Sequence, residues 1–226
     1  MAANKPTLKT VRLTTPVEPA DLAQLEIGNV VYLDGTIFTG REGVFKRAVH
    51  EGHGLPAPPE VIGNVNFHCS PAAARRDDGS YDIGAVTATA SFRFAAWLDQ
   101  WFEMSKCKVI IGKGGMTPDV YKKSFVPNEA VYLTTVGYGT GALLGRGIKA
   151  VKDVYWMDEL GIAQAMWLFE VENFGPFLVE SDLAGNSLFE RENAKVAAGL
   201  DKVYEGLKPA IMSRYGETDD RKEELI

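Results

Sequence analysis

Two apolar segments that each run straight into a glycine-rich loop constrain the fold of this chain most. Lys108–Ile111 precedes the loop Gly112–Gly115, and Ala130–Val136 precedes the loop Gly137–Gly141, after which small residues follow. Short apolar segments that end in such loops are typical of buried strands that are followed by helices. The chain is therefore expected to mix strands and helices along its length.

Further apolar segments extend this pattern toward both ends of the chain. Val30–Leu33 and Thr36–Thr39 flank Asp34-Gly35, a pair that is typical of a hairpin turn, and Trp167–Val171 and Phe177–Glu180 are predicted as later strands. Because the first two strands are expected to form a hairpin, the sequence predicts an α/β fold with a mixed sheet rather than a doubly wound parallel one.

Helices are predicted where capping residues precede spaced apolar ones. A short helix is expected after Pro19, and a longer one over Phe92–Met104, with Thr89–Ser91 as its capping segment. Residues 1–10 are expected to be flexible, residues 11–190 to form one domain without an internal linker, and residues 191–226 to form a helical C-terminal extension.

Charge and hydropathy limit the classes of partner. The 226 residues carry a formal net charge of −6 and contain no basic block, which argues against nucleic acid and anionic membranes as partners. No segment approaches the roughly 18 to 20 apolar residues that cross a bilayer, and the first residues lack the apolar segment of a secretory signal. A cytoplasmic location is the expectation.

Cysteine and histidine are too scarce for this chain to build a metal site alone. Cys69 and Cys107 are too few for a disulfide framework or an iron–sulfur cluster, and are expected to be buried as small apolar residues. His50, His53 and His68 lack the spacing of a zinc site. Metal chemistry, if the protein uses any, is expected to come from another chain.

Four places put a polar or cationic side chain beside glycine or a helix start, where an anion can meet backbone N–H groups as well as a charge. They are Arg41, the turn from Thr89 to Arg93, Lys113 and the loop at residues 137–141. Arg93 lies in the first turn of its predicted helix, where a cation opposes the helix dipole. Each has an ordinary alternative reading, as a surface arginine, a turn lysine or a plain cap.

Several short motifs occur in a fixed order between residues 10 and 190. They are GNVVYLDGT at 28–36, TGRE at 39–42, FHCSP at 67–71, TATASFRF at 87–94, IGKGGM at 111–116, ELG at 159–161, FGP at 174–176, and Asp182 with GNSL at 185–188. Their order and spacing resemble the C-terminal, or beta, domain of the iron–sulfur class I fumarases and L(+)-tartrate dehydratases.

This resemblance implies a swivelling β/β/α domain over residues 11–190 that works against a larger alpha subunit. The alpha subunit would hold a [4Fe–4S] cluster on three cysteines, while this chain alone would bind no cofactor or metal. Arg41, Arg93 and Lys113 would hold the carboxylates of a small dicarboxylic acid, and Thr89 would take the proton from carbon. The expected activity is reversible hydration or dehydration, with alpha–beta pairs that assemble further.

The sequence also departs from the motifs of this family. The box that reads R-D-x-x-H in the family ends here in Phe45 instead of histidine, with Glu42 in place of aspartate, and Ala90 replaces the second of two paired threonines. Phenylalanine cannot move a proton or hydrogen-bond a substrate. These changes favour a second hypothesis, in which the chain is a noncatalytic binding or assembly subunit with the same fold.

A third hypothesis assigns residues 137–142 to a G-x-G-x-x-A dinucleotide loop, with Asp153 or Asp158 as the acid that binds the ribose. Such a motif normally opens a Rossmann domain, whereas here it lies in the second half of the chain. The sequence favours this hypothesis least.

Overall fold

The fold is described from a computed structural model, which describes residues 8–206. The chain divides into two compact units, Met1–Glu190 and Arg191–Ile226. Strand β1 begins at Thr10, and residues 1–7 of the predicted flexible segment lie outside the described residues. Of the predicted extension, helix α8 (Leu188–Tyr204) is described and residues 207–226 are not.

Seven strands of the described chain form one sheet in the order β1-β2-β3-β6-β7-β9-β8. The strands β1, β2, β3, β6 and β7 run parallel, whereas β9 is antiparallel to β7, β8 and β2. Their bounds are β1 Thr10–Thr14, β2 Val30–Thr39, β3 Val65–Phe67, β6 Val109–Gly112, β7 Val131–Thr135, β8 Ile148–Tyr155 and β9 Met166–Ser181. The expected α/β fold with a mixed sheet is confirmed.

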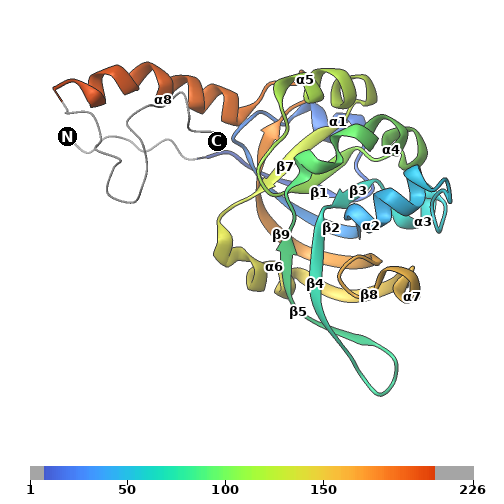
Figure 1. Cartoon of the computed structure of the whole chain (residues 1–226). Helices are drawn as coiled ribbons and strands as arrows, with labels where there is room; N and C mark the ends of the chain where they lie inside the picture. The colour runs from blue at the N-terminus through green and yellow to red at the C-terminus, as the bar shows by residue number, and fades with distance from the viewer. Residues whose placement is uncertain (1–7, 207–226) are drawn as a thin grey trace, which may run out of the picture. The chain divides into compact units, whose positions relative to one another are not determined.

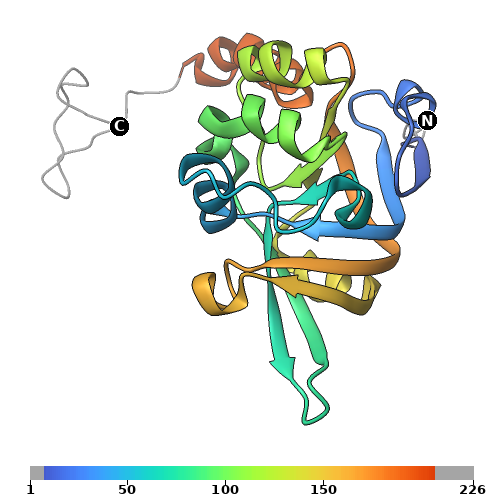
Figure 2. The same cartoon turned by 90° about the vertical axis from the view of Figure 1, so that its right-hand side faces the viewer.

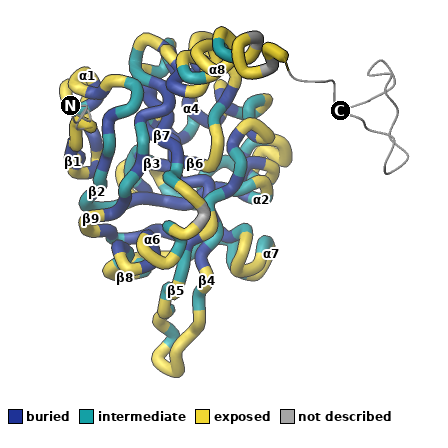
Figure 3. Tube along the Cα trace, turned by 90° about the vertical axis from the view of Figure 1, so that its left-hand side faces the viewer, coloured by how far each residue is buried: buried dark blue, intermediate teal, exposed yellow. Residues whose placement is uncertain are grey.

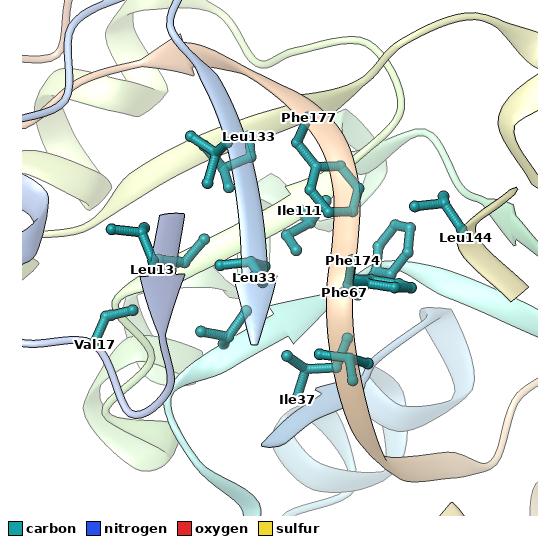
Figure 4. Packing of buried hydrophobic residues seen from close by; sticks show 14 of the residues in the cluster. Leu13, Val17, Leu33, Ile37, Phe67, Ile111, Leu133, Leu144, Phe174 and Phe177 are labelled. Carbon is teal, nitrogen blue, oxygen red and sulfur yellow. The ribbon is translucent and has the colours of Figure 1, made fainter. Parts of the chain in front are cut away.

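The pairing between β2 and β9 closes β2, β3, β6, β7 and β9 into a ring of hydrogen-bonded strands. Because side chains alternate across a strand, every second residue points into this ring, and the ring interior holds a hydrophobic cluster. Figure 4 shows this packing. The cluster includes Leu33, Ile37, Phe67, Ile111, Leu133, Phe174 and Phe177.

The other face of the sheet is covered by short helices, among them α2 Glu42–Phe45, η1 Lys46–His50, α3 Pro59–Ile62, η2 Ser91–Trp97, α4 Leu98–Ser105, α5 Pro118–Val120 and η3 Tyr121–Phe125 (Figure 1). A second, aromatic-rich cluster fills the space between them and the sheet, and includes Phe38, Phe45, Phe94, Trp101, Tyr121 and Tyr132. The remaining short helices are α1 Pro19–Ala23, η4 Val126–Asn128, η5 Tyr138–Thr140, α6 Gly141–Gly147 and α7 Met157–Leu160, and Leu22 of α1 and Leu144 of α6 belong to the cluster of the strand ring.

A two-stranded ribbon, β4 (Cys69–Arg75) and β5 (Tyr81–Ala88), extends away from the sheet (Figures 1 and 2). Its tip is exposed, whereas its base joins the buried strand ends (Figure 3). The Tyr81 ring packs edge-on against Trp167 of β9 with centroids 5.0 Å apart. The ribbon returns the chain from β3 to the turn at Thr89.

The predicted hairpin at Asp34-Gly35 is wrong, because Val30–Thr39 is one continuous strand. Gly35 has φ +105°, and the register between β2 and β9 shifts at this point, which indicates a β-bulge. A Cβ at Gly35 would lie 2.6 Å from Thr15 Oγ1. Glycine therefore permits a bulge and a close approach here, not a turn.

Two other predicted features differ in detail. The two late strands are parts of the single strand β9, and β1 and β8 were not predicted. The predicted helix over 92–104 begins as a 3-10 helix at Ser91, and its cap residue is Ala90, which makes no side-chain cap. The hydroxyl of Ser91 is used elsewhere, as described below.

Candidate functional site

All four predicted site residues follow strands that end at the same edge of the sheet or beside it. Arg41 follows β2 by two residues, and Lys113 follows β6 directly. These strands are parallel, so their carboxyl ends meet at one edge, which is where α/β sheets bind ligands. Thr89 follows β5 of the ribbon and Arg93 lies one turn later.

Backbone contacts bring the Thr89 turn against the loop that carries Lys113. The Lys113 N–H donates to the Thr89 carbonyl at 3.0 Å, and Ala90 forms a parallel bridge with Lys113. The Thr89 N–H donates to the carbonyl of His68 at 2.7 Å. Thr89 is 8% exposed, and no hydrogen bond reaches its hydroxyl from the described residues. The predicted base and the predicted cation are therefore neighbours in a sheltered place.

The two arginines are held by adjacent helices. The Phe45 ring of α2 stacks on Phe94 of η2 with centroids 4.9 Å apart, which places the helix that begins after Arg41 beside the helix that carries Arg93. Arg41 Nη1 donates to the Ala163 carbonyl at 2.9 Å, while its Nε is buried without a hydrogen-bond partner among the described residues. Most buried N–H groups have a hydrogen-bond partner, so this one is an exception within the site.

An acidic neighbour partly neutralises Arg93. Arg93 Nη1 lies 3.4 Å from Glu42 Oε2, and both side chains are about half exposed. Glu42 occupies the place of the aspartate in the family's box. The pair is exposed enough for solvent to screen it, so a ligand carboxylate can compete for the arginine.

Lys113 also borders a small cleft of about 110 Å³. The glycine loop after β7 forms its other wall, where the Thr140 hydroxyl donates to the Gly137 carbonyl at 3.1 Å. The lining residues are Val86, Thr87, Ala88, Lys113, Thr135, Gly137, Thr140, Gly141 and Leu144. The cleft adjoins Thr89 through Ala88, so the predicted loop at 137–141 belongs to the same site.

The setting of this loop does not fit a dinucleotide site. A Rossmann motif needs a strand, a loop, a helix and a following parallel strand. Here the strand after α6 is β8, which pairs antiparallel with β9. The third hypothesis from the sequence is therefore wrong.

The residue that replaces the family's histidine lies in the core. Phe45 is 0% exposed, and its ring contacts Phe94, Trp101 and the ring of His68. Its side chain cannot reach a ligand at the surface. The departure at this position therefore changes the packing beneath the site.

Three buried polar side chains beneath the site were not singled out from the sequence. His68 Nδ1 lies 2.7 Å from Ser91 Oγ, and the Tyr132 hydroxyl donates to the same oxygen at 2.7 Å. All three are 0% exposed. Burial lowers the pKa of His68 to about 3, so its ring is neutral. Only Tyr132 lies within a strand, whereas His68 follows β3 and Ser91 begins η2, so no shared local pattern marks the three residues.

A second buried polar group supports the Lys113 loop from the other side. Glu180 of β9 is 0% exposed, and its Oε1 accepts from the Ser187 hydroxyl at 2.6 Å. Burial raises the pKa of Glu180. The Tyr121 hydroxyl accepts from the Met116 N–H at 2.8 Å, and a Cβ at Gly115 would lie 3.0 Å from that hydroxyl. The loop is therefore closely packed where it leaves Lys113.

The cysteines of this chain do not fit a cluster. Cys69 and Cys107 are free, and each is 1% exposed. Burial raises the pKa of the Cys69 thiol well above its usual value and that of Cys107 to about 12. Metal ligation needs thiolates, which burial disfavours here. Among the residues that the structure describes, no group of three or more His, Cys, Asp and Glu side chains could hold a metal ion.

Three exposed apolar side chains are adjacent in sequence to residues of the site or its cleft. Phe92 is 63% exposed between Ser91 and Arg93, Leu143 is 49% exposed on α6, and Ile162 is 43% exposed beside the carbonyl that holds Arg41. Large apolar side chains that rim a polar site are typical of a protein contact. No helix in residues 8–206 combines the length and the apolar character needed to cross a membrane.

Comparison with known proteins gives consistent matches. The model of the family described as Fumarase C-terminus matches residues 1–192. A Methanocaldococcus jannaschii protein with the provisional name L(+)-tartrate dehydratase subunit beta is 33% identical over 81% of this chain and 93% of its own length. The L(+)-tartrate dehydratase subunit beta of Escherichia coli K12 is 28% identical over 85% of this chain and 93% of that protein.

A fourth match is longer than this chain. A Geobacillus stearothermophilus protein with the provisional name fumarate hydratase class I is 29% identical over 80% of this chain but only 34% of its own length. The segment that corresponds to this chain is therefore about a third of that protein.

Proposed function

Because this chain belongs to the fumarase C-terminus family, we propose that it is the beta subunit of a hydro-lyase that reversibly hydrates or dehydrates a small dicarboxylic acid. The names of its relatives support this reaction class and the role of a subunit. One observation carries the proposal: Arg41, Thr89, Arg93 and Lys113 come from separate segments, and the fold gathers them at one edge of the sheet.

The cations would bind the substrate carboxylates. Arg41 has a buried Nε without a partner in the described chain, and an arginine can hold a carboxylate through two N–H groups. Lys113 is exposed beside the cleft, and Arg93 would exchange Glu42 for a substrate carboxylate. Three cations around a dianion fix its orientation, which supplies much of the rate enhancement for a positioned substrate.

Thr89 would take the proton from the substrate carbon. A threonine hydroxyl is a very weak base in water, so this role needs cations close by and a site from which water is excluded. Lys113 is its hydrogen-bonded neighbour through the backbone, and Thr89 is 8% exposed even before a partner covers the site. Thr89 Oγ1 would act as an alkoxide that the nearby cations stabilise, and the proton from the carbon would restore its hydroxyl. The electron pair of the broken C–H bond would form the C=C bond, and the hydroxyl on the adjacent carbon would leave as hydroxide.

A partner subunit would complete the site. Phe92, Leu143 and Ile162 are exposed, and each is adjacent in sequence to a residue of the site or of its cleft, so an alpha subunit that covers the cations would also bury apolar side chains. The buried thiols of this chain are unsuited to hold a cluster, so we place the [4Fe–4S] cluster on the alpha subunit. When bound there, the cluster would supply a Lewis acid for the substrate hydroxyl and carboxylate.

Two observations favour a second candidate function, that of a noncatalytic subunit. Phe45 is buried where the family has a histidine, and Glu42 pairs with Arg93. In this case the chain would bind a diacid, or only the alpha subunit, without turnover.

The test is anaerobic co-expression with the cluster-bearing subunit, followed by an absorbance assay of fumarate, mesaconate, malate and tartrate turnover. Thr89→Ala and Arg41→Ala are expected to lower turnover at least about a hundredfold. Lys123→Ala is the matched control, since Lys123 pairs with Asp119 on an exposed helix segment and is expected to leave turnover unchanged.

The outcomes separate the two functions. Turnover of one diacid that both site substitutions abolish supports the hydro-lyase. A stable complex that carries a cluster and turns over none of the four diacids supports the noncatalytic subunit instead. The chain alone is expected to be colourless and inactive.

A further inference from the structure

A row of fully buried polar side chains lies directly beneath the site, between the sheet and the helices. It consists of Asn66, His68, Ser91 and Tyr132, each 0% exposed. Asn66 and Tyr132 both pair with Ile110 in register, so they flank it on the helix-covered face of the sheet. These four residues are called the buried relay below.

The distances within the buried relay determine which of its atoms donate hydrogen bonds and which accept them. In the orientation that satisfies both ends of its amide, Asn66 donates from Nδ2 to His68 Nε2 at 3.1 Å. Because Nε2 then accepts, the ring proton lies on Nδ1 and is donated to Ser91 Oγ at 2.7 Å. The Tyr132 hydroxyl donates to the same oxygen at 2.7 Å. Ser91 is therefore the common acceptor of two fixed donors.

The buried relay contacts all three backbone segments that carry the site. At one end, Asn66 Oδ1 lies 3.1 Å from the nitrogen of Gly40, directly before Arg41, and shares this N–H with the Phe67 carbonyl, which accepts it at 3.0 Å. At the other end, Ser91 lies between Thr89 and Arg93. A Cβ at Gly112, directly before Lys113, would overlap Ser91 Oγ and lie 2.5 Å from the Tyr132 hydroxyl.

The stability of the fold alone gives little reason for a row of buried polar side chains at this place. Replacing both partners of a buried hydrogen bond by apolar groups of similar shape is often nearly neutral, whereas a buried polar group without a partner costs about 1 to 3 kcal/mol. The hydrophobic cluster inside the strand ring already packs the opposite face of the same strands. A polar row in the layer next to the site therefore indicates a positioning role.

We propose that the buried relay positions the Thr89 turn against Arg41 and Lys113, with His68 as the positioning residue whose Nδ1–H fixes Ser91. The inference rests on the proposed function, since it assigns how this chain aligns its own proton acceptor and cations. His68 does not touch the substrate, because its ring is fully buried and packs edge-on against Phe45 and Phe94.

A matched pair of variants separates hydrogen bonding from packing. His68→Asn keeps a donor near the place of Nδ1 but removes the ring, whereas His68→Phe keeps a ring of similar size but has no donor. If the ring matters only as core packing, His68→Phe will be the better variant. If the Nδ1–H donor positions Ser91, His68→Asn will be the better one.

The measurement uses the complex with its cluster-bearing subunit and compares kcat, KM and the primary deuterium isotope effect with a diacid deuterated at the carbon that loses its proton. His68→Phe is expected to lower kcat about tenfold with KM within about twofold, and to raise the isotope effect because proton transfer becomes slower. His68→Asn is expected to regain most of kcat, and Tyr132→Phe to lose about threefold.

A measurement on the full chain without its partner tests separately which ring nitrogen of His68 carries the proton. In histidine-labelled ¹⁵N NMR, His68 is expected as the Nδ1–H tautomer, with the exposed His50 and His53 as internal references. The Nε2–H tautomer would contradict the hydrogen bonds assigned to His68, and with them its role as the donor to Ser91. This measurement also stands if a His68 variant does not fold.

The kinetic outcomes are equally distinct. Equal kcat in the wild-type, His68→Phe and Tyr132→Phe complexes, or a better His68→Phe than His68→Asn, would overturn the positioning role while leaving the proposed function intact. A wild-type complex that turns over no diacid would overturn the proposed function and with it the catalytic purpose of the buried relay, whatever the tautomer.

Discussion

The two buried layers of this protein differ in chemistry although they share the same strands. Inside the strand ring, hydrophobic side chains form a cluster around Phe67, Ile111 and Phe177. On the opposite face of the same strands, aromatic rings surround the buried relay. The apolar layer lies away from the site and the mixed layer lies directly beneath it. From this difference we infer that the apolar layer maintains the fold and that the mixed layer aligns the site.

The largest expected change in the free energy of unfolding comes from a substitution in the apolar layer. Phe177→Ala removes a ring that packs edge-on against Phe67 with centroids 5.7 Å apart, and should lower the free energy of unfolding by about 3 to 5 kcal/mol. Urea unfolding of the full chain measures it. Phe92→Ala is the control, because its ring is 63% exposed and its loss should change the unfolding free energy of the chain by about 0.5 kcal/mol or less. Equal effects would contradict the comparison.

His68, in the mixed layer, should make the free energy of unfolding depend on pH. The folded pKa of His68 is about 3 and its ordinary value is 6.5, so below pH 6.5 the unfolded chain binds a proton that the folded chain does not. Stability is therefore full above pH 6.5 and declines as the pH falls toward 3, by about 2 kcal/mol between pH 6.5 and 5.

Urea midpoints measured across this pH range test the prediction. His68→Asn should flatten the curve between pH 6.5 and 5, because asparagine does not titrate. The same slope in the variant and the wild type would show that other groups cause the pH dependence.

Substitutions of Ser91 and Tyr132 in the buried relay should have coupled effects on the free energy of unfolding. Ser91→Ala leaves the His68 Nδ1–H and the Tyr132 hydroxyl without their acceptor and should lower the unfolding free energy by about 1 to 3 kcal/mol. Adding Tyr132→Phe should recover part of this loss, since one unpaired donor is then removed. A double-mutant cycle measures the coupling, and strictly additive losses would refute it.

The smallest expected effect concerns the surface above the mixed layer. Glu42→Gln removes the charge 3.4 Å from Arg93, and because both side chains are about half exposed the free energy of unfolding should change by less than about 1 kcal/mol. The freed arginine should lower KM for a diacid about two- to fivefold, as measured in the assembled complex. An unchanged or higher KM would exclude Arg93 from the substrate clamp.

Some of this molecule could be predicted from local patterns. The strands β6 and β7 with their glycine loops, the class of fold, and the residues Arg41, Thr89, Arg93 and Lys113 were all visible in the sequence, because buried strands and glycine turns depend on nearby residues. The roles of those four residues remain predictions.

Other features depended on contacts between distant segments. The Asp34-Gly35 pair looks like a hairpin turn, yet a bulge against β9 and the approach of Thr15 decide its conformation. Ser91 looks like a helix cap, but its hydroxyl is held by residues of β7 and of the end of β3.

The sequence by itself determined the strands β6 and β7 with their glycine loops and the family motifs, since each is encoded within a few residues, and its composition determined the scarcity of cysteine and histidine. Only the tertiary structure decided that Phe45 is core, that His68 is buried and neutral, and that one relay joins the segments of Arg41, Thr89 and Lys113. The physical reason is that burial and hydrogen-bond partnership depend on the pairing of strands far apart in the chain, which no local pattern specifies.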